Sequence, residues 1–141
     1  MLGMPTTLSS HGLINARNKF RALQTLSTHG IPIPPTLLLA SRIKPKVINE
    51  EMDFPAVIKL LSGTQGIGVM KVSDSKDAIP IIDTLDELGQ VVCIQKFLEN
   101  PGEDIRAFVV DGRLIAAMKR VAPPDDWRTN IHLGQKCFRM N

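Results

Sequence analysis

The segment VIKLLSGTQGIGVMKV, residues 57–72, sets three glycines between two apolar, β-branched runs and places a lysine inside each run. Runs of this kind favour strands, and a glycine-rich connection between them predicts a hairpin. Alternation puts Lys59 on the same strand face as Val57 and Leu61. A lysine there either extends its ammonium group to solvent at a sheet edge or meets an anion. The segment is therefore the first candidate for a binding site.

The glycine loop matches neither of two common nucleotide motifs. A P-loop needs Lys-Ser/Thr after its last glycine and leads into a helix, whereas Gly68 is followed by the strand-like VMKV. A dinucleotide-binding turn needs a third spaced glycine and a helix, which are also lacking. Either the glycines only permit a tight or bulged hairpin, or their backbone N–H groups cover an anion such as phosphate. The glycines alone favour the plain hairpin, and Lys59 beside them favours ligand binding; Lys71 is interpreted as a solvated strand residue.

Capping residues, periodicity and turn residues predict the other elements. In order, we expect a helix over residues 15–30, a strand over 36–40, a short helix and turn over 42–54, a hairpin over 55–73, a helix over 74–89, a strand over 90–98, a hairpin over 105–121 and a polar loop over 122–135. No closing strand or helix is expected after that loop. This order predicts an α+β fold with antiparallel sheets and packed helices.

Two details of these helices follow from residue type. Asn15 is expected to cap the first helix, and Asp74 or Ser75 the last one. The last helix is expected to bury a stripe at helical spacing, formed by Ile79, Ile82, Leu85 and Leu88.

Composition limits the classes of function. The chain has 141 residues, of which 43% are hydrophobic and 22% charged, as in a globular domain. No apolar run approaches the roughly 20 residues that cross a bilayer, and no secretory signal is evident, so we expect a cytoplasmic protein without membrane contact. The net charge of +3 and the scarcity of aromatic residues argue against direct nucleic-acid binding. Cys93 and Cys137 form no zinc motif.

Two further patterns place polar residues on alternate positions. Asp104 and Arg106 face the same way on an expected strand, as a structural ion pair or as ligands for a ribose hydroxyl and a phosphate. Arg128, Asn130 and His132 share one face of an extended segment, and suit phosphate, carboxylate or a proton; an ordinary polar loop is the alternative.

Taken together, these stretches resemble the ATP-grasp superfamily, and most closely the RimK-type ligases that add glutamate to the C-terminus of a ribosomal protein. The resemblance runs from about Asn15 to Gly134 and rests on NKFRALQTLSTHGIPIPPT, AVIKLLSGTQGIGV, IQKFL, DIRAFVVDGRLIAAMKR and WRTNIHLG in the family's order.

The resemblance implies a role for each matched residue. Lys59 and Lys19 would contact the ATP phosphates, and Asp104 the ribose. Three residues would be catalytic: Arg106 at the acceptor carboxylate or a phosphate, and Arg128 and Asn130 at the reaction centre. Arg128, Thr129 and Asn130 would also bind the triphosphate, and His132 would lie at the substrate. The closing flap would be Ser62, Gly63, Thr64, Gln65, Gly66, Ile67 and Gly68, and the adenine hinge Gln95, Lys96, Phe97 and Leu98. The family more often has an acidic residue at the position of Lys96.

The resemblance also implies a reaction and a division of the chain. ATP would phosphorylate a carboxylate, and an amine would then attack the acyl phosphate; glutamate is the expected amino acid and a protein or peptide the possible acceptor. Magnesium ligands are expected in a C-terminal stretch outside this chain, with no metal ligand inside it, so we expect an inactive fragment. Residues 1–12 would be a leader or disordered, residues 13–98 the nucleotide-clamping subdomain with flap 62–68, and residues 99–141 the start of the larger subdomain.

Other interpretations stay open. The parent protein could be a related ligase of the glutathione-synthase-like or lysine-biosynthesis type, or a non-catalytic nucleotide-binding module. Family members often form homo-oligomers.

Overall fold

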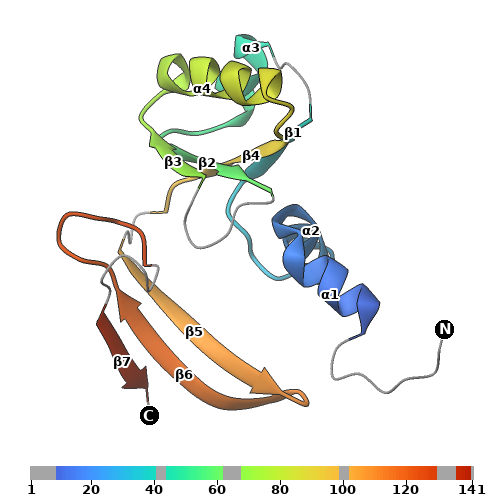
Figure 1. Cartoon of the computed structure of the whole chain (residues 1–141), viewed down its shortest axis with the longest axis vertical. Helices are drawn as coiled ribbons and strands as arrows, with labels where there is room; N and C mark the ends of the chain where they lie inside the picture. The colour runs from blue at the N-terminus through green and yellow to red at the C-terminus, as the bar shows by residue number, and fades with distance from the viewer. Residues whose placement is uncertain (1–8, 41–43, 62–67, 99–101, 130–135, 141) are drawn as a thin grey trace. The chain divides into compact units, whose positions relative to one another are not determined.

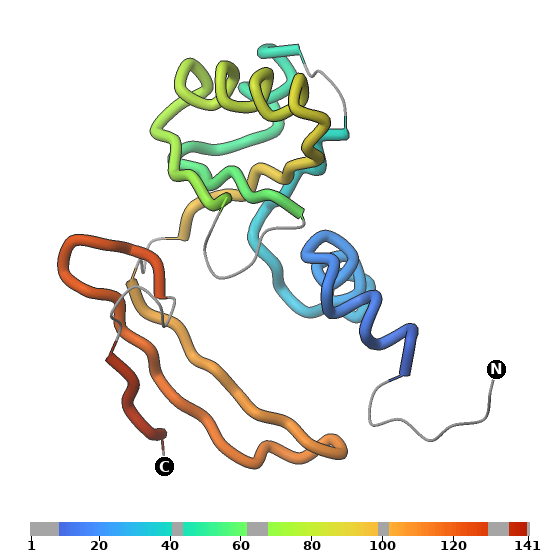
Figure 2. The backbone as a smooth tube through the Cα atoms, viewed as in Figure 1, coloured from blue at the N-terminus to red at the C-terminus, as the bar shows by residue number. Residues whose placement is uncertain are grey.

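The computed structural model describes residues 9–40, 44–61, 68–98, 102–129 and 136–140. These residues form two compact units, one reaching to Phe97 and the other starting at Leu98. Figure 1 shows the elements of each unit, and Figure 2 traces the backbone through them.

The first unit is built on a four-stranded antiparallel sheet. Its strands lie in the order β1-β4-β2-β3, with β1 at Thr36–Leu39, β2 at Ala56–Leu60, β3 at Val69–Val72 and β4 at Val92–Lys96. The expected hairpin about the glycine loop is confirmed, because β2 and β3 pair antiparallel. Helices α3 (Pro45–Glu51) and α4 (Ser75–Glu87) cover one face of this sheet (Figure 1).

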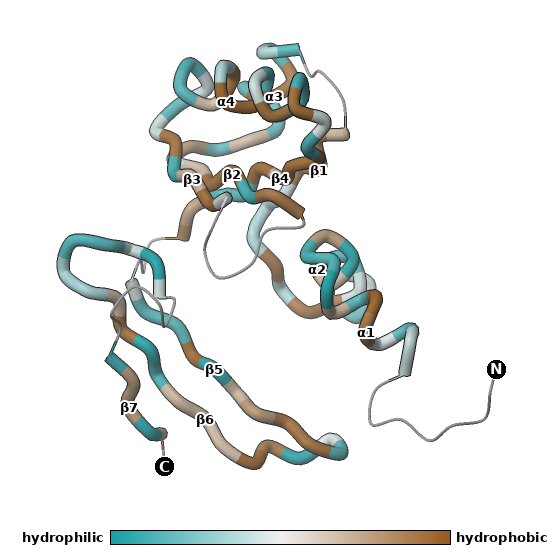
Figure 3. The backbone as a smooth tube through the Cα atoms, viewed as in Figure 1, coloured by the Kyte–Doolittle hydropathy of each residue, from teal (hydrophilic) through white to brown (hydrophobic). Residues whose placement is uncertain are grey.

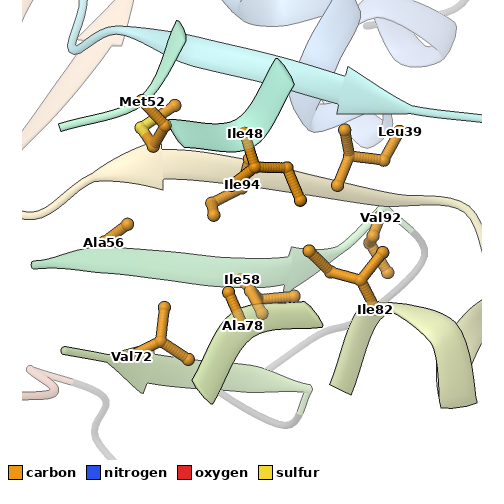
Figure 4. Packing of buried hydrophobic residues seen from close by; sticks show 10 residues of the cluster. All are labelled: Leu39, Ile48, Met52, Ala56, Ile58, Val72, Ala78, Ile82, Val92 and Ile94. Carbon is orange, nitrogen blue, oxygen red and sulfur yellow. The ribbon is translucent and has the colours of Figure 1, made fainter. Parts of the chain in front are cut away.

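The covered face holds the core. Ile58 and Ile94 from neighbouring strands are fully buried and meet Ile48 of α3 and Ile82 of α4 (Figure 4). Alternation along β2 therefore works as expected: Ala56 and Ile58 turn to the helices, and their neighbours in sequence turn to the other face of the sheet. That other face carries the candidate site.

The N-terminal helix differs from the sequence prediction. It is two helices, α1 at Ser10–Arg17 and α2 at Lys19–Thr28. Asn15 lies inside α1 rather than capping it; the cap is Ser9, and Asn18 interrupts the helix because its side chain accepts from two N–H groups of α2. Helix α1 therefore starts at Ser10, five residues before the expected cap.

Helix α4 agrees with the prediction at its start and departs from it at its end. Asp74 is the N-cap, accepting from Lys76 N at 2.8 Å and Asp77 N at 3.0 Å. Leu88 was expected in the buried stripe but is 67% exposed, because it follows the last helical turn and Gly89 adopts a φ of +68° there.

The second unit is a three-stranded antiparallel sheet in the order β5-β6-β7, comprising Glu103–Val110, Arg113–Val121 and Lys136–Met140. The predicted Asp-Gly turn is confirmed, since Asp111 and Gly112 both have positive φ, as a two-residue hairpin turn requires. Strand β7 corrects the expectation that nothing follows the polar loop: it pairs along β6 through its backbone. The half of the β5–β6 hairpin that lies nearer to its turn is strongly hydrophobic (Figure 3).

Candidate functional site

The face of the first sheet opposite α3 and α4 brings Lys59 together with polar partners. Lys59 is level with Cys93 on β4, and one row away Val57 is level with Gln95. Gln95 is in turn level with Thr36 on the next strand, β1. Side chains at paired positions share a face, so the lysine, amide and hydroxyl groups gather on one surface.

These groups form a continuous hydrogen-bond relay across three strands. Lys59 Nζ donates to Gln95 Oε1 at 2.5 Å, and Gln95 Nε2 donates to Thr36 Oγ1 at 2.7 Å. The hydroxyl of Thr36 then donates to the carbonyl of Pro34 at 2.8 Å. Gln95 is only 8% exposed, so its amide is a fixed acceptor that holds the lysine in place.

The surroundings of Lys59 affect the charge of its ammonium group. Burial lowers the pKa of its ammonium group, the neighbouring Cys93 opposes that shift, and Lys19 adds to it. Burial likewise raises the pKa of the Cys93 thiol, so the row beside the lysine stays neutral. A partly desolvated cation with one neutral acceptor gains more from an anionic ligand than a solvated one does.

Lys19, the second expected lysine, lies at the same end of β2. It is the first residue of α2, and its Nζ donates to the carbonyls of Leu60 at 3.1 Å and Leu61 at 3.5 Å. These carbonyls directly precede the glycine loop. The structure therefore places Lys19 and Lys59 near each other at the end of β2 that precedes the glycine loop, and the phosphate contacts that the resemblance implies stay a prediction.

The flap itself, Ser62 to Ile67, lies outside the described residues. Its last glycine, Gly68, has a φ of +73°, and its carbonyl accepts from Leu60 N at 3.0 Å. A Cβ added at Gly68 would lie 2.5 Å from the Leu60 side chain, so the loop re-enters β3 where only glycine fits.

The expected hinge is held by the sheet at its backbone. The N–H of Lys96 donates to Pro35 O at 2.9 Å, and the N–H of Phe97 donates to Pro55 O at 3.0 Å. These two N–H groups are therefore already used in hydrogen bonds within the protein. Leu98, the last expected hinge residue, is 59% exposed.

The side chains at the hinge have partners that the sequence did not suggest. Lys96 Nζ forms an ion pair with Asp53 Oδ2 at 2.9 Å. Lys71 was interpreted as a solvated strand residue, but its Nζ lies 4.0 Å from the centre of the Phe97 ring. Lys71 is nevertheless exposed, so this cation–π contact adds a partner and does not contradict that interpretation.

In the second unit Asp104 is engaged by a different arginine from the one expected. Arg120, level with it on β6, donates through Nε to Asp104 Oδ1 at 2.6 Å and through Nη2 to Oδ2. Thr129 Oγ1 also donates to Oδ2, at 2.5 Å. The ion pair with Arg106 considered from spacing is therefore wrong: Arg106 acts on Asp104 only through its charge.

This arrangement fixes the charge state of Asp104. Burial alone would raise the pKa of its carboxyl group, but the hydrogen bonds from Arg120 and Thr129 outweigh burial and hold the pKa below its ordinary value. The same pair raises the pKa of Arg120. Asp104 thus ties the loop that carries Thr129 to the sheet, and Arg120 is a functional candidate that sequence reasoning missed.

Arg128 has a local partner. Its guanidinium donates to Asp126 Oδ1 at 3.0 Å and Oδ2 at 2.8 Å, and its backbone N–H donates to Oδ1 at 2.9 Å. These hydrogen bonds lower the pKa of Asp126 to about 2. Asn130 and His132, expected on the same face as Arg128, lie outside the described residues.

The carboxylates do not assemble into a metal site in the part of the chain that the structure describes, where no group of three or more His, Cys, Asp or Glu side chains is close enough to hold an ion. Asp104 and Asp126 each form an ion pair with an arginine. Within the same residues, none of the helices has the length and hydropathy of a membrane span.

The fold matches solved ATP-grasp ligases. A D-alanine–D-alanine ligase from Bacillus anthracis superimposes with a TM-score of 0.67 at 21% identity, covering 89% of this chain and 42% of that chain. The ATP-grasp ligase PsnB, complexed with minimal precursor, gives 0.68 at 23% identity, covering 99% and 42%. The α+β ATP-grasp fold predicted from the sequence is therefore confirmed.

The particular family follows from the sequence. The RimK-like ATP-grasp domain matches residues 16–141, and the chain belongs to this family. It is 46% identical over 129 residues to a "Probable alpha-L-glutamate ligase" of Rhodopirellula baltica, covering 89% of this chain and 32% of that protein. It is 39% identical over 138 residues to a protein of the same name from Syntrophotalea carbinolica, covering 96% and 46%. The chain thus spans between about a third and a half of the length of these relatives.

Proposed function

We propose that the chain is the nucleotide-binding part of an ATP-dependent carboxylate–amine ligase that joins glutamate to a protein or peptide, such as a ribosomal protein, in the cytoplasm. Family membership and the relatives named as glutamate ligases support the reaction class. The observation that carries the proposal is the partly buried Lys59, held by Gln95 next to the glycine loop and beside Lys19.

The proposed chemistry has two steps. A carboxylate oxygen of one substrate attacks the γ-phosphorus of ATP, which forms an acyl phosphate and releases ADP. The amine nitrogen of the other substrate then attacks the acyl carbon, and the amide forms as inorganic phosphate and a proton leave. In this scheme Lys59 and Lys19 bind and neutralise the ATP phosphates, while Arg128 and Arg106 orient the charged reactants.

No magnesium site can be assigned within the described residues. The described acidic residues do not fit it, since no cluster of three ligands exists among them and the Asp104 and Asp126 carboxylates accept from arginines. A solved structure of one neighbour, the ATP-grasp ligase PsnB, is a complex with minimal precursor, Mg and ADP. We expect little ligation from these 141 residues alone.

The alternative is a nucleotide-binding module that does not catalyse ligation. The observation that favours it is that no group of metal-binding carboxylates lies among the described residues. Both candidates bind ATP. A ligase assay separates them, because only the ligase releases ADP in a reaction that needs both glutamate and a protein or peptide acceptor.

Titration with ATP tests the shared part of the proposal. The wild-type chain, Lys59→Met and the control Lys46→Met are compared by calorimetry; Lys46 is an exposed residue of α3 paired with Glu50. A contact between an ammonium group and phosphate is worth about 1.5–3 kcal/mol, so Lys59→Met is expected to weaken binding by about 10- to 150-fold and Lys46→Met hardly at all. Equal affinities for all three proteins, or no ATP binding by the wild type, would contradict the proposal.

A further inference from the structure

Strand register gathers arginines on one face of the second sheet. Asp104 is level with Arg120, and in the next row Arg106 is level with Met118, which is level with Arg139 on β7. Positions two apart along a strand share a face, so both rows lie on the same side. We call this surface, formed by Asp104, Arg106, Met118, Arg120 and Arg139, the arginine face.

The charges on the arginine face are unbalanced. Arg120 is neutralised by Asp104. Arg106 and Arg139 are both exposed, and within residues 102–129 and 136–140 neither takes part in an ion pair. Two guanidinium groups therefore remain to attract an anion. The other face of the sheet differs in character: it carries Ile105 and Phe138, 64% and 53% exposed.

The spacing of the two arginines selects the kind of anion. Arg106 and Arg139 are separated by one strand, so their Cα atoms lie about 10 Å apart, with Met118 between them. A guanidinium binds a carboxylate through two parallel hydrogen bonds. Two such groups on either side of an apolar thioether fit a ligand with two carboxylates joined by a short aliphatic stem, which packs on Met118. A single compact phosphate would leave one arginine unused.

We propose that Arg139, together with Arg106, is a specificity-determining residue that binds the carboxylates of an acidic amino-acid or acidic peptide substrate across Met118. This inference rests on the proposed ligase function, whose acidic substrate it assigns to the arginine face. It adds a residue from β7, a strand that the sequence did not predict, to the candidate substrate site.

The experiment is a titration of the full chain with a triglutamate peptide, followed by amide chemical shifts. Arg139→Gln is expected to weaken binding by about tenfold or more, Arg139→Lys by less because one charge remains, and Arg106→Gln as much as Arg139→Gln. Arg113→Gln is the matched control, since Arg113 is an exposed arginine of the same sheet at the hairpin turn, outside the arginine face. Triglutamine and tripolyphosphate serve as the neutral and phosphate ligands.

Every outcome of this titration either supports the proposal or overturns it. Loss of triglutamate binding in Arg139→Gln but not in Arg113→Gln, with no such loss for the other two ligands, supports the proposal. It is overturned if the wild type does not bind triglutamate, if Arg139→Gln binds it unchanged, or if the substitution weakens only tripolyphosphate binding. ATP titration of the wild type and Lys59→Met distinguishes a failure of this inference from a failure of the proposed function. If ATP binding depends on Lys59 but triglutamate does not bind, the proposed function stands and only this inference is removed.

Discussion

The hydrogen bond between Lys59 and Gln95 can be measured as a coupling free energy. Replacing Lys59 by Met leaves the Gln95 carbonyl oxygen, on a side chain only 8% exposed, without its donor. Replacing Gln95 by Leu removes that acceptor and also the donor to Thr36. A hydrogen bond to a charged group is worth about 1.5–3 kcal/mol and a neutral one about 0.5–1.5 kcal/mol. Relief of a buried charge offsets part of the first loss. We expect the free energy of unfolding to fall by about 1–2 kcal/mol in Lys59→Met and about 2–4 kcal/mol in Gln95→Leu.

The double variant is the informative one. Apolar groups in place of both partners are close to neutral, so Lys59→Met with Gln95→Leu should cost about 1–2 kcal/mol less than the sum of the single costs. Chemical unfolding followed by far-ultraviolet circular dichroism gives the four free energies. In thermal unfolding, about 4–8 °C per kcal/mol for a unit of this size makes the differences visible. Costs that add to within about 0.5 kcal/mol would refute the relay as the reason for the position of Lys59.

Other predictions concern single positions. Gly68→Ala should lower the free energy of unfolding by about 1–3 kcal/mol more than Gly30→Ala, because both glycines have positive φ but only the first would bring its Cβ within 2.5 Å of a leucine side chain; equal losses in urea unfolding would argue against this steric account. The carboxyl group of Asp126 should titrate near pH 2 by NMR and nearer its ordinary 3.8 in Arg128→Ala. Because the folded pKa is depressed, the stabilisation from this pair is complete above about pH 4 and is lost as the pH falls towards 2, and an unshifted midpoint would show that the pair does not form in solution. Leu88→Ala should change the free energy of unfolding by less than about 0.5 kcal/mol, since that side chain is 67% exposed; a larger loss would show that Leu88 packs in the core.

Elements marked by local signals were predictable from the sequence. A capping aspartate at Asp74, an Asp-Gly turn at residues 111–112 and alternation in β2 each act over a few residues, and the structure has them where they were expected. The capping of the first helix failed for a related reason: Asn15 and Asn18 are both good caps, and the sequence does not say which side chain finds free N–H groups.

Contacts between strands that are distant in the sequence were not predictable in the same way. Asp104 and Arg106 are neighbours along the chain and invited a pairing, but the register of β5 with β6 places Arg120 opposite the carboxylate. Strand β7 has no alternation of buried and exposed residues, since all five are exposed, so only its backbone pairing with β6 defines it. Arg139 could not be assigned to a face without that register.

For the candidate site, the sequence pattern located Lys59, and the resemblance supplied Lys19 and the expected roles of both. What it could not supply is the environment of Lys59, because the relay to Thr36 exists only once β2, β4 and β1 lie side by side. The roles carried over from the family remain predictions, and the substitutions above test the central ones.

The backbone at the end of β4 also limits how the expected hinge could recognise a base. The N–H groups of Lys96 and Phe97 already donate to the carbonyls of Pro35 and Pro55, so these two donors are used within the protein. A base at this end of the strand would have to find its hydrogen-bond donors elsewhere. The two hydrogen bonds that fasten β4 to the segments before β1 and β2 therefore also restrict the contacts that the hinge can make.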